Sequence, residues 1–169
     1  MKAKLIIEDK EIEIEISEEE YKKLQPSKEK KTGYERVPKS DTYFYTYPNG
    51  CVETTCEDCY NIDDECYESA NYYSSETVAE NNARADRLMR QLRRFSVKHR
   101  EDGVNLNDAN TRQYCIYYDY GNNTLGTAFT LCAKTFGVIC FDSDETALAA
   151  INKFRDELIW YFTEYKDSL

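Results

Sequence analysis

The chain has 169 residues and a formal net charge of −10, from 32 acidic residues against 22 lysines and arginines. This charge makes nucleic acid a poor direct partner, because an acidic surface repels phosphates; it favours a basic protein partner or a purely solubilising role. The sequence shows neither a signal-peptide pattern nor an apolar run near the ~20 residues of a membrane helix. The cysteine count of 7 is odd and argues against a disulfide framework, so we predict a cytoplasmic protein in a reducing compartment.

Residues 1–26 predict a small N-terminal ββα piece. Within it, residues 3–16 place alternating apolar and charged side chains around a polar turn, which is the pattern of a β-hairpin. Ser17 and Glu20 have capping-box spacing for a short helix that Pro26 ends. A piece of this size buries little apolar surface, so we expect it to dock on the rest of the chain or on a partner.

Residues 34–112 predict a first module that ends in a long helix. Two β-prone runs flank the strong turn sequence Pro48-Asn49-Gly50 and predict a hairpin. Residues 56–70 are acidic, rich in cysteine and without a clear period, which predicts a loop. An amphipathic helix is predicted from about residue 75 to 98, with an apolar face formed by Val78, Ala85, Met89 and Leu92.

Residues 113–169 predict a second module with the same order of elements. Strands are predicted at 113–120, 124–133 and 138–141, which would form a three-strand meander. Asp142 or Ser143 then caps a closing helix that runs to about residue 166. Its apolar face recurs at three- and four-residue steps, through Ala147, Ile151, Phe154, Leu158 and Tyr161.

The modules together predict an α+β fold. We expect antiparallel sheets with two long amphipathic helices packed on one face, plus the small N-terminal piece. Hairpin and then helix occurs twice, which leaves two explanations open. Either two ββ(β)α modules arose by duplication, or capped helices that follow strands simply look alike.

Four cysteines stand close together in the sequence, with the spacing Cys-x4-Cys-x2-Cys-x6-Cys. Zinc binds four thiolates in a tetrahedron, and a Cys-x2-Cys pair lets one tight turn supply two of them. The cluster predicts one structural zinc ion that fixes the acidic loop, with free or buried thiols as the alternative. The predicted ligands are Cys51, Cys56, Cys59 and Cys66.

The chain separates its charges along the sequence. No lysine or arginine occurs from residue 40 to 83, where ten acidic residues lie. This stretch is either a solvated loop or a mimic of phosphate spacing that occupies the basic channel of a nucleic-acid-binding protein. The predicted partner-binding residues are Glu57, Asp58, Asp63, Asp64, Glu65 and Glu68.

The helix that follows is basic, with Arg84, Arg87, Arg90, Arg94 and Lys98 along one side. We interpret it as a solvated face that neutralises acidic neighbours in the same chain or in a second copy, with phosphate contact as the alternative. The 15 tyrosines predict a thin sheet that leaves some tyrosines exposed, and exposed tyrosine is a preferred interface residue.

Signatures of catalysis are absent from the sequence. It contains no phosphate-binding loop, dinucleotide fingerprint, nucleophile elbow or zincin motif. The single histidine, His99, lies in a basic polar segment without an evident catalytic partner and is predicted to be a surface residue. We therefore predict that the protein is not an enzyme.

Four segments carry a resemblance to known proteins: TYFYTYPNG, NYYSSETVAENNARADRL, QYCIYYDYGNNTL and ICFDSDETALAAI. In type and order they resemble small acidic proteins encoded by phages and prophages of low-GC Gram-positive bacteria. Some proteins of this kind are similar to anti-CRISPR proteins that inhibit type II effectors such as Cas9, and a few of those bind zinc. The four-cysteine stretch departs from the group, whose corresponding segment is acidic without these cysteines.

The resemblance implies a phage inhibitor that acts in the host cytoplasm. It would bind Cas9 or its guide RNA complex through acidic, tyrosine-bearing surface and block guide or target DNA, without binding nucleic acid directly. Two other functions stay open: a structural or accessory phage protein that self-associates, for instance as a homodimer, and a metal-stabilised regulator that uses the basic helix on nucleic acid.

Overall fold

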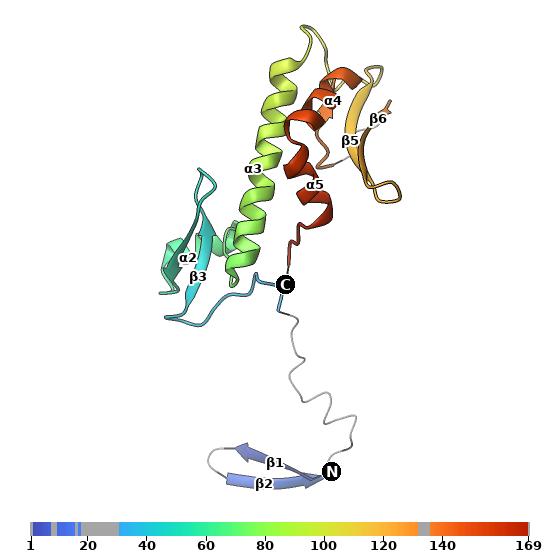
Figure 1. Ribbon diagram of the computed structural model, residues 1–169. Helices are drawn as coiled ribbons and strands as arrows, with labels where there is room; N and C mark the ends of the chain where they lie inside the picture. The colour runs from blue at the N-terminus through green and yellow to red at the C-terminus, as the bar shows by residue number, and fades with distance from the viewer. Residues whose placement is uncertain (1, 8–9, 16, 18–30, 132–135, 169) are drawn as a thin grey trace. The chain divides into compact units, whose positions relative to one another are not determined.

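The computed structural model describes the chain except for residues 1, 8–9, 16, 18–30, 132–135 and 169 (Figure 1). The chain divides into two compact units, residues 1–31 and 32–169. The first unit contains the strands β1 (Lys2–Ile7) and β2 (Lys10–Glu15), which pair antiparallel with Leu5 opposite Ile12. This pairing confirms the N-terminal hairpin, whereas the helix predicted after Ser17 lies outside the described residues.

The second unit is α+β, as predicted. It begins with an antiparallel hairpin of β3 (Thr42–Thr46) and β4 (Val52–Cys56), whose turn contains Gly50 at φ 87°. Phe44 and Val52, on the inner side of this hairpin, pack against the start of the long helix α3 (Glu76–His99). Alternation along the strands therefore turns Phe44 and Val52 toward the helix and Tyr43, which is 1% exposed, toward the opposite face of the hairpin.

The stretch predicted as a loop contains a helix, α2 (Asn61–Glu68). The segment lacks an apolar period, so its periodicity gives no helical signal. Its start is set by polar contacts instead: the Asp63 carboxylate accepts a hydrogen bond from the Tyr60 backbone N–H at 3.0 Å. Asp63 and Asp64 also lie in the first turn, where negative charge is stabilised by the helix dipole.

The rest of the unit is a three-stranded sheet followed by two helices. β5 (Gln113–Asp119) lies between β6 (Thr124–Thr130) and the short β7 (Cys140–Phe141), so the sheet order is β6-β5-β7. The predicted meander is therefore wrong, because β7 pairs with β5 rather than with β6. This pairing buries Phe141, which is 1% exposed, in the main hydrophobic cluster.

The prediction of a single closing helix, made from the apolar period, is also wrong. It is broken at Phe154 into α4 (Asp144–Lys153) and α5 (Arg155–Thr163), with Phe154 at φ −114° and ψ 23°. The Ser143 hydroxyl caps α4 by accepting from the Thr146 N–H at 3.1 Å, as the sequence predicted. The break brings the Phe154 ring edge-on to Phe95 of α3, with 5.7 Å between the ring centroids.

Helix α3 contributes to two separate hydrophobic clusters. Val78 and Ala79 at its start pack with Tyr73, Tyr34, Phe44 and Val52. Farther along, Leu88, Leu92 and Phe95 join the larger cluster with the following residues of β7, α4 and α5: Phe141, Ala147, Ala150, Ile151 and Leu158. The contacts of α3 with β3 and β4, and with α4 and α5, follow from this arrangement (Figure 1).

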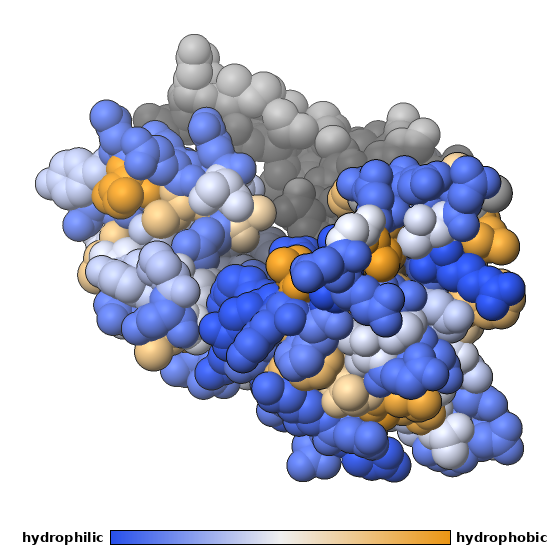
Figure 2. Space-filling view, turned by 90° about the horizontal axis from the view of Figure 1, so that it is seen from above, coloured by the Kyte–Doolittle hydropathy of each residue, from blue (hydrophilic) through white to orange (hydrophobic). Residues whose placement is uncertain are grey.

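The two predicted modules of the second unit differ in their sheets: the first contains the two-stranded sheet β3-β4, and the second contains the three-stranded sheet β6-β5-β7. Among the described helices, none is long and apolar enough to span a membrane. On the face seen from above, hydrophobic residues form small separate patches among hydrophilic ones (Figure 2). Apolar area alone therefore does not mark an interface on that face.

Candidate interaction surface

Glu57, directly after β4, is buried at 1% exposure, although the sequence predicted it on a partner-binding surface. Its carboxylate accepts hydrogen bonds from Nε and Nη2 of Arg36 at 2.8 and 3.0 Å, a bidentate pair. It also accepts from the Tyr72 hydroxyl and the Cys59 backbone N–H, both at 2.9 Å. These donors, Arg36 foremost, lower the pKa of Glu57 to about 2 against the opposing effect of burial. Glu57 holds the fold together and does not face a partner.

Asp63 of α2 is the second predicted partner-binding residue that is buried, at 2% exposure. Its Oδ1 accepts from the Tyr43 hydroxyl at 2.8 Å, and its Oδ2 accepts from the backbone N–H groups of Asp58 and Tyr60. Burial, and then the hydrogen bond to Asp63, raises the pKa of Tyr43. A buried carboxylate requires such donors, because it has lost its contacts with water. Asp63 therefore anchors α2 and is not available to a partner.

Two stacked tyrosines link these buried carboxylates. The rings of Tyr43 and Tyr72 lie 3.9 Å apart between centroids, with 14° between their planes. The hydroxyl of Tyr43 donates to Asp63, and that of Tyr72 donates to Glu57. Burial raises the pKa of Tyr72 to about 12, so both tyrosines stay neutral donors. The pair fastens α2 to the β3–β4 hairpin.

The other four predicted residues are exposed. Asp64 forms an ion pair with Arg36 at 2.6 Å, whereas the three others make no ion pair within the described part of the chain. Large apolar side chains stand beside them, with exposures of 67% for Tyr60, 60% for Ile62 and 42% for Tyr67. We call the set the α2 surface: Asp58, Tyr60, Ile62, Glu65, Tyr67 and Glu68.

Sequence reasoning missed two residues that shape this surface. Ile62 has only Cys66 at helical spacing within α2, so it gave almost no periodic signal. Arg36 lies shortly before the long stretch without lysine or arginine, and that position could have marked it as the cation that neutralises the stretch. It pairs with both Glu57 and Asp64 and lies 5.7 Å from the centre of the Tyr67 ring.

The four cysteines do not converge. Cys51 and Cys56 lie at opposite ends of β4, and an extended strand at ~3.3 Å per residue separates them by ~16 Å. Zinc ligands lie ~2.3 Å from the ion, so Cys51 and Cys56 do not fit one site while β4 is intact. Within the described ranges, no group of three cysteine, histidine or acidic residues is arranged to hold a metal ion. Cys59 is exposed, and Cys66 lies beside the Tyr43 hydroxyl.

The basic helix is only partly neutralised. Arg84 forms a bidentate pair with Glu157 of α5, at 2.8 and 3.1 Å, and its guanidinium lies 3.9 Å from the centre of the Trp160 ring. Arg87, Arg90, Arg94 and Lys98 are exposed, and the part of the chain that the structure describes provides no ion pair for them. Among the described residues of one chain, the interpretation of a neutralising face is therefore confirmed for Arg84 alone, and neutralisation by a second copy stays a prediction.

Comparison with known proteins adds no family to this description. No protein-family model matches the chain, and no curated protein or solved structure is significantly similar to it.

Proposed function

We propose that this chain is a non-enzymatic binding protein that uses the α2 surface to hold a basic surface of a nucleic-acid-handling host protein. One observation carries the proposal: exposed carboxylates that make no ion pair among the described residues occur together with exposed Tyr60 and Ile62 in one short segment, residues 58–68. Carboxylates attract a basic partner over long range and favour the correct orientation, while tyrosine supplies a large contact area once the surfaces meet.

The buried contacts beneath the α2 surface support this function. A flexible acidic loop would lose conformational entropy on binding, which weakens affinity. Here Glu57 and Asp63 are held by several donors each, so the exposed side chains stand on a fixed helix. A rigid acidic surface can compete with nucleic acid for a basic channel. The resemblance to phage inhibitors nominates Cas9 as the first target, with blocking of guide or target DNA as the consequence.

Binding to purified Cas9, with and without guide RNA, tests the proposal by calorimetry at low and physiological salt. Glu65→Lys reverses a charge on the α2 surface and is expected to weaken binding by about tenfold or more. Asp102→Lys is the matched control, because it makes the same charge change at an exposed turn after α3. Affinity should fall with salt, since exposed charges are screened.

Three results would count against the proposal. No binding to Cas9 at either salt concentration would exclude that target. Equal weakening by Glu65→Lys and Asp102→Lys would show that net charge, and not the α2 surface, governs binding. A large stable homo-oligomer in size-exclusion chromatography, with no effect on interference in cells, would favour the self-associating accessory protein instead.

A further inference from the structure

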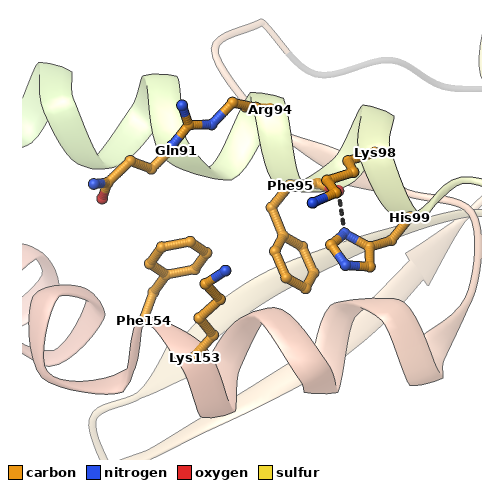
Figure 3. A pocket seen from close by; sticks show the side chains of 7 residues that line it. All are labelled: Gln91, Arg94, Phe95, Lys98, His99, Lys153 and Phe154. Carbon is orange, nitrogen blue, oxygen red and sulfur yellow. Dashed lines mark hydrogen bonds between the residues drawn. The ribbon is translucent and has the colours of Figure 1, made fainter.

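A cavity of about 390 Å³ lies between α3 and the break that separates α4 from α5. Gln91, Arg94, Phe95, Lys98 and His99 line it from α3, and Lys153 and Phe154 line it from the opposite side (Figure 3). The cavity shares no residue with the α2 surface, so a ligand in it would bind independently of that surface.

Positive charge converges on this cavity. Arg94 and Lys98 are four residues apart on α3, and Lys153 faces them from the end of α4. None of the seven lining residues is acidic, and across the described residues none of these three cations makes an ion pair. In a chain with a net charge of −10, acidic side chains are plentiful enough to neutralise such a cluster. Its missing counter-charge points to a ligand.

Aromatic rings hold the cavity in shape. The Lys153 ammonium lies between two of them, 5.3 Å from the centre of the Phe95 ring and 5.5 Å from that of Phe154 (Figure 3). The His99 ring stacks on Phe95 at 3.9 Å, and its Nδ1 lies 2.9 Å from the Phe95 carbonyl oxygen. Lys153 and Phe154 lie at the junction of α4 and α5, on the side of the cavity opposite α3 (Figure 3). The break in the predicted single helix therefore adjoins this site.

We propose that the cavity binds a small phosphorylated ligand of the nucleotide class. Its volume falls in the range of ~300–1,000 Å³ that small-molecule sites occupy. The forked guanidinium of Arg94 suits phosphate oxygens, and the lysines add point charges. The Phe154 ring at the edge of the cavity offers a surface for a flat base. A long polyanion is disfavoured, because the acidic remainder of the chain would repel it.

Calorimetry with ATP, inorganic triphosphate, adenosine and a short single-stranded DNA, at low salt and without divalent metal, tests the assignment. ATP is expected to bind more tightly than each of the other three. No binding of ATP would overturn the proposal. Equal affinity for inorganic triphosphate would also overturn it, since charge alone would then explain binding. Tighter binding of the DNA would replace the nucleotide by a nucleic acid.

Two substitutions test the location of the site. Arg94→Gln and Lys153→Gln are each expected to weaken ATP binding by about tenfold, the effect of losing one charge-assisted hydrogen bond. Arg93→Gln is the matched control: it removes the same charge from the adjacent position, whose side chain lines a different hollow with Ser96 and Val97. Its ATP affinity should change less than about twofold. A loss in Arg93→Gln as large as in Arg94→Gln would overturn the assignment.

Discussion

Glu57→Gln tests whether the buried carboxylate holds the first half of the second unit together. The substitution keeps the size of the side chain but replaces one acceptor oxygen with an NH2 donor. In either orientation of the amide, the new NH2 group faces two of the four groups that donate hydrogen bonds to Glu57. At least one of those two is an N–H group of Arg36 or Cys59, which cannot accept a hydrogen bond. Hydrogen bonds to charged groups contribute about 1.5–3 kcal/mol each, so we expect the free energy of unfolding to fall by about 2–4 kcal/mol.

Urea unfolding followed by far-UV circular dichroism at pH 7 measures this loss. Glu65→Gln is the control, because Glu65 is exposed and its substitution should change the free energy of unfolding by less than about 0.5 kcal/mol. If Glu57→Gln proved as stable as this control, the carboxylate would not be the anchor described above.

The pH dependence provides a second readout of the same contact. The pKa of Glu57 is about 2 in the folded protein, below its ordinary value of 4.5. The folded state therefore binds fewer protons than the unfolded chain. Its contribution to stability is complete above about pH 4.5 and is lost as the pH falls toward 2. The difference in stability between the wild type and Glu57→Gln should shrink over this range, and a constant difference would refute the reasoning.

Three further predictions follow from local geometry. Gly33 has φ 94°, and Gly33→Ala would add a Cβ only 2.7 Å from a Val78 methyl group. The substitution should therefore lower the free energy of unfolding by about 2–3 kcal/mol, as measured by thermal unfolding. Gly103→Ala, at φ 82° with nothing within 4 Å, should cost only about 1 kcal/mol; equal costs would contradict the clash. Burial raises the pKa of Cys115 to about 12, so at pH 8 iodoacetamide should label it far more slowly than exposed Cys51, as peptide mass spectrometry would detect. Because β4 holds Cys51 away from Cys56, Cys51→Ser should leave the zinc content unchanged in elemental analysis; a fall would mean that β4 rearranges around metal.

The α+β class could be predicted because strands and helices leave different periods in the sequence. The apolar face of α3 and the Ser143 cap of α4 are local signals, and both elements begin within a residue or two of the expected positions. Helix α2 left no such signal, because polar contacts with distant residues stabilise it. The pairing of β7 with β5 also left no local signal, because it depends on the burial of Phe141 against residues of α3.

For the candidate site, the sequence predicted which residue types occur but not which of them are exposed. The acidic stretch was recognised, but the sequence could not show that Glu57 and Asp63 are buried, since their donors come from Arg36, Tyr43 and Tyr72, mostly far along the chain. The break at Phe154 was equally hidden. The residue is neither glycine nor proline, and its apolar spacing fits an unbroken helix.

The position of α3 in two hydrophobic clusters has a thermodynamic consequence. Val78 and Ala79 belong to one cluster and Leu88, Leu92 and Phe95 to the other, so the clusters share this helix but no residue. An allosteric link between sites requires an element with two arrangements that both ligands bias, and a straight, well-packed helix supplies none. Occupancy at the basic cavity should therefore leave affinity at the α2 surface unchanged, and the binding free energies at the two ends should simply add.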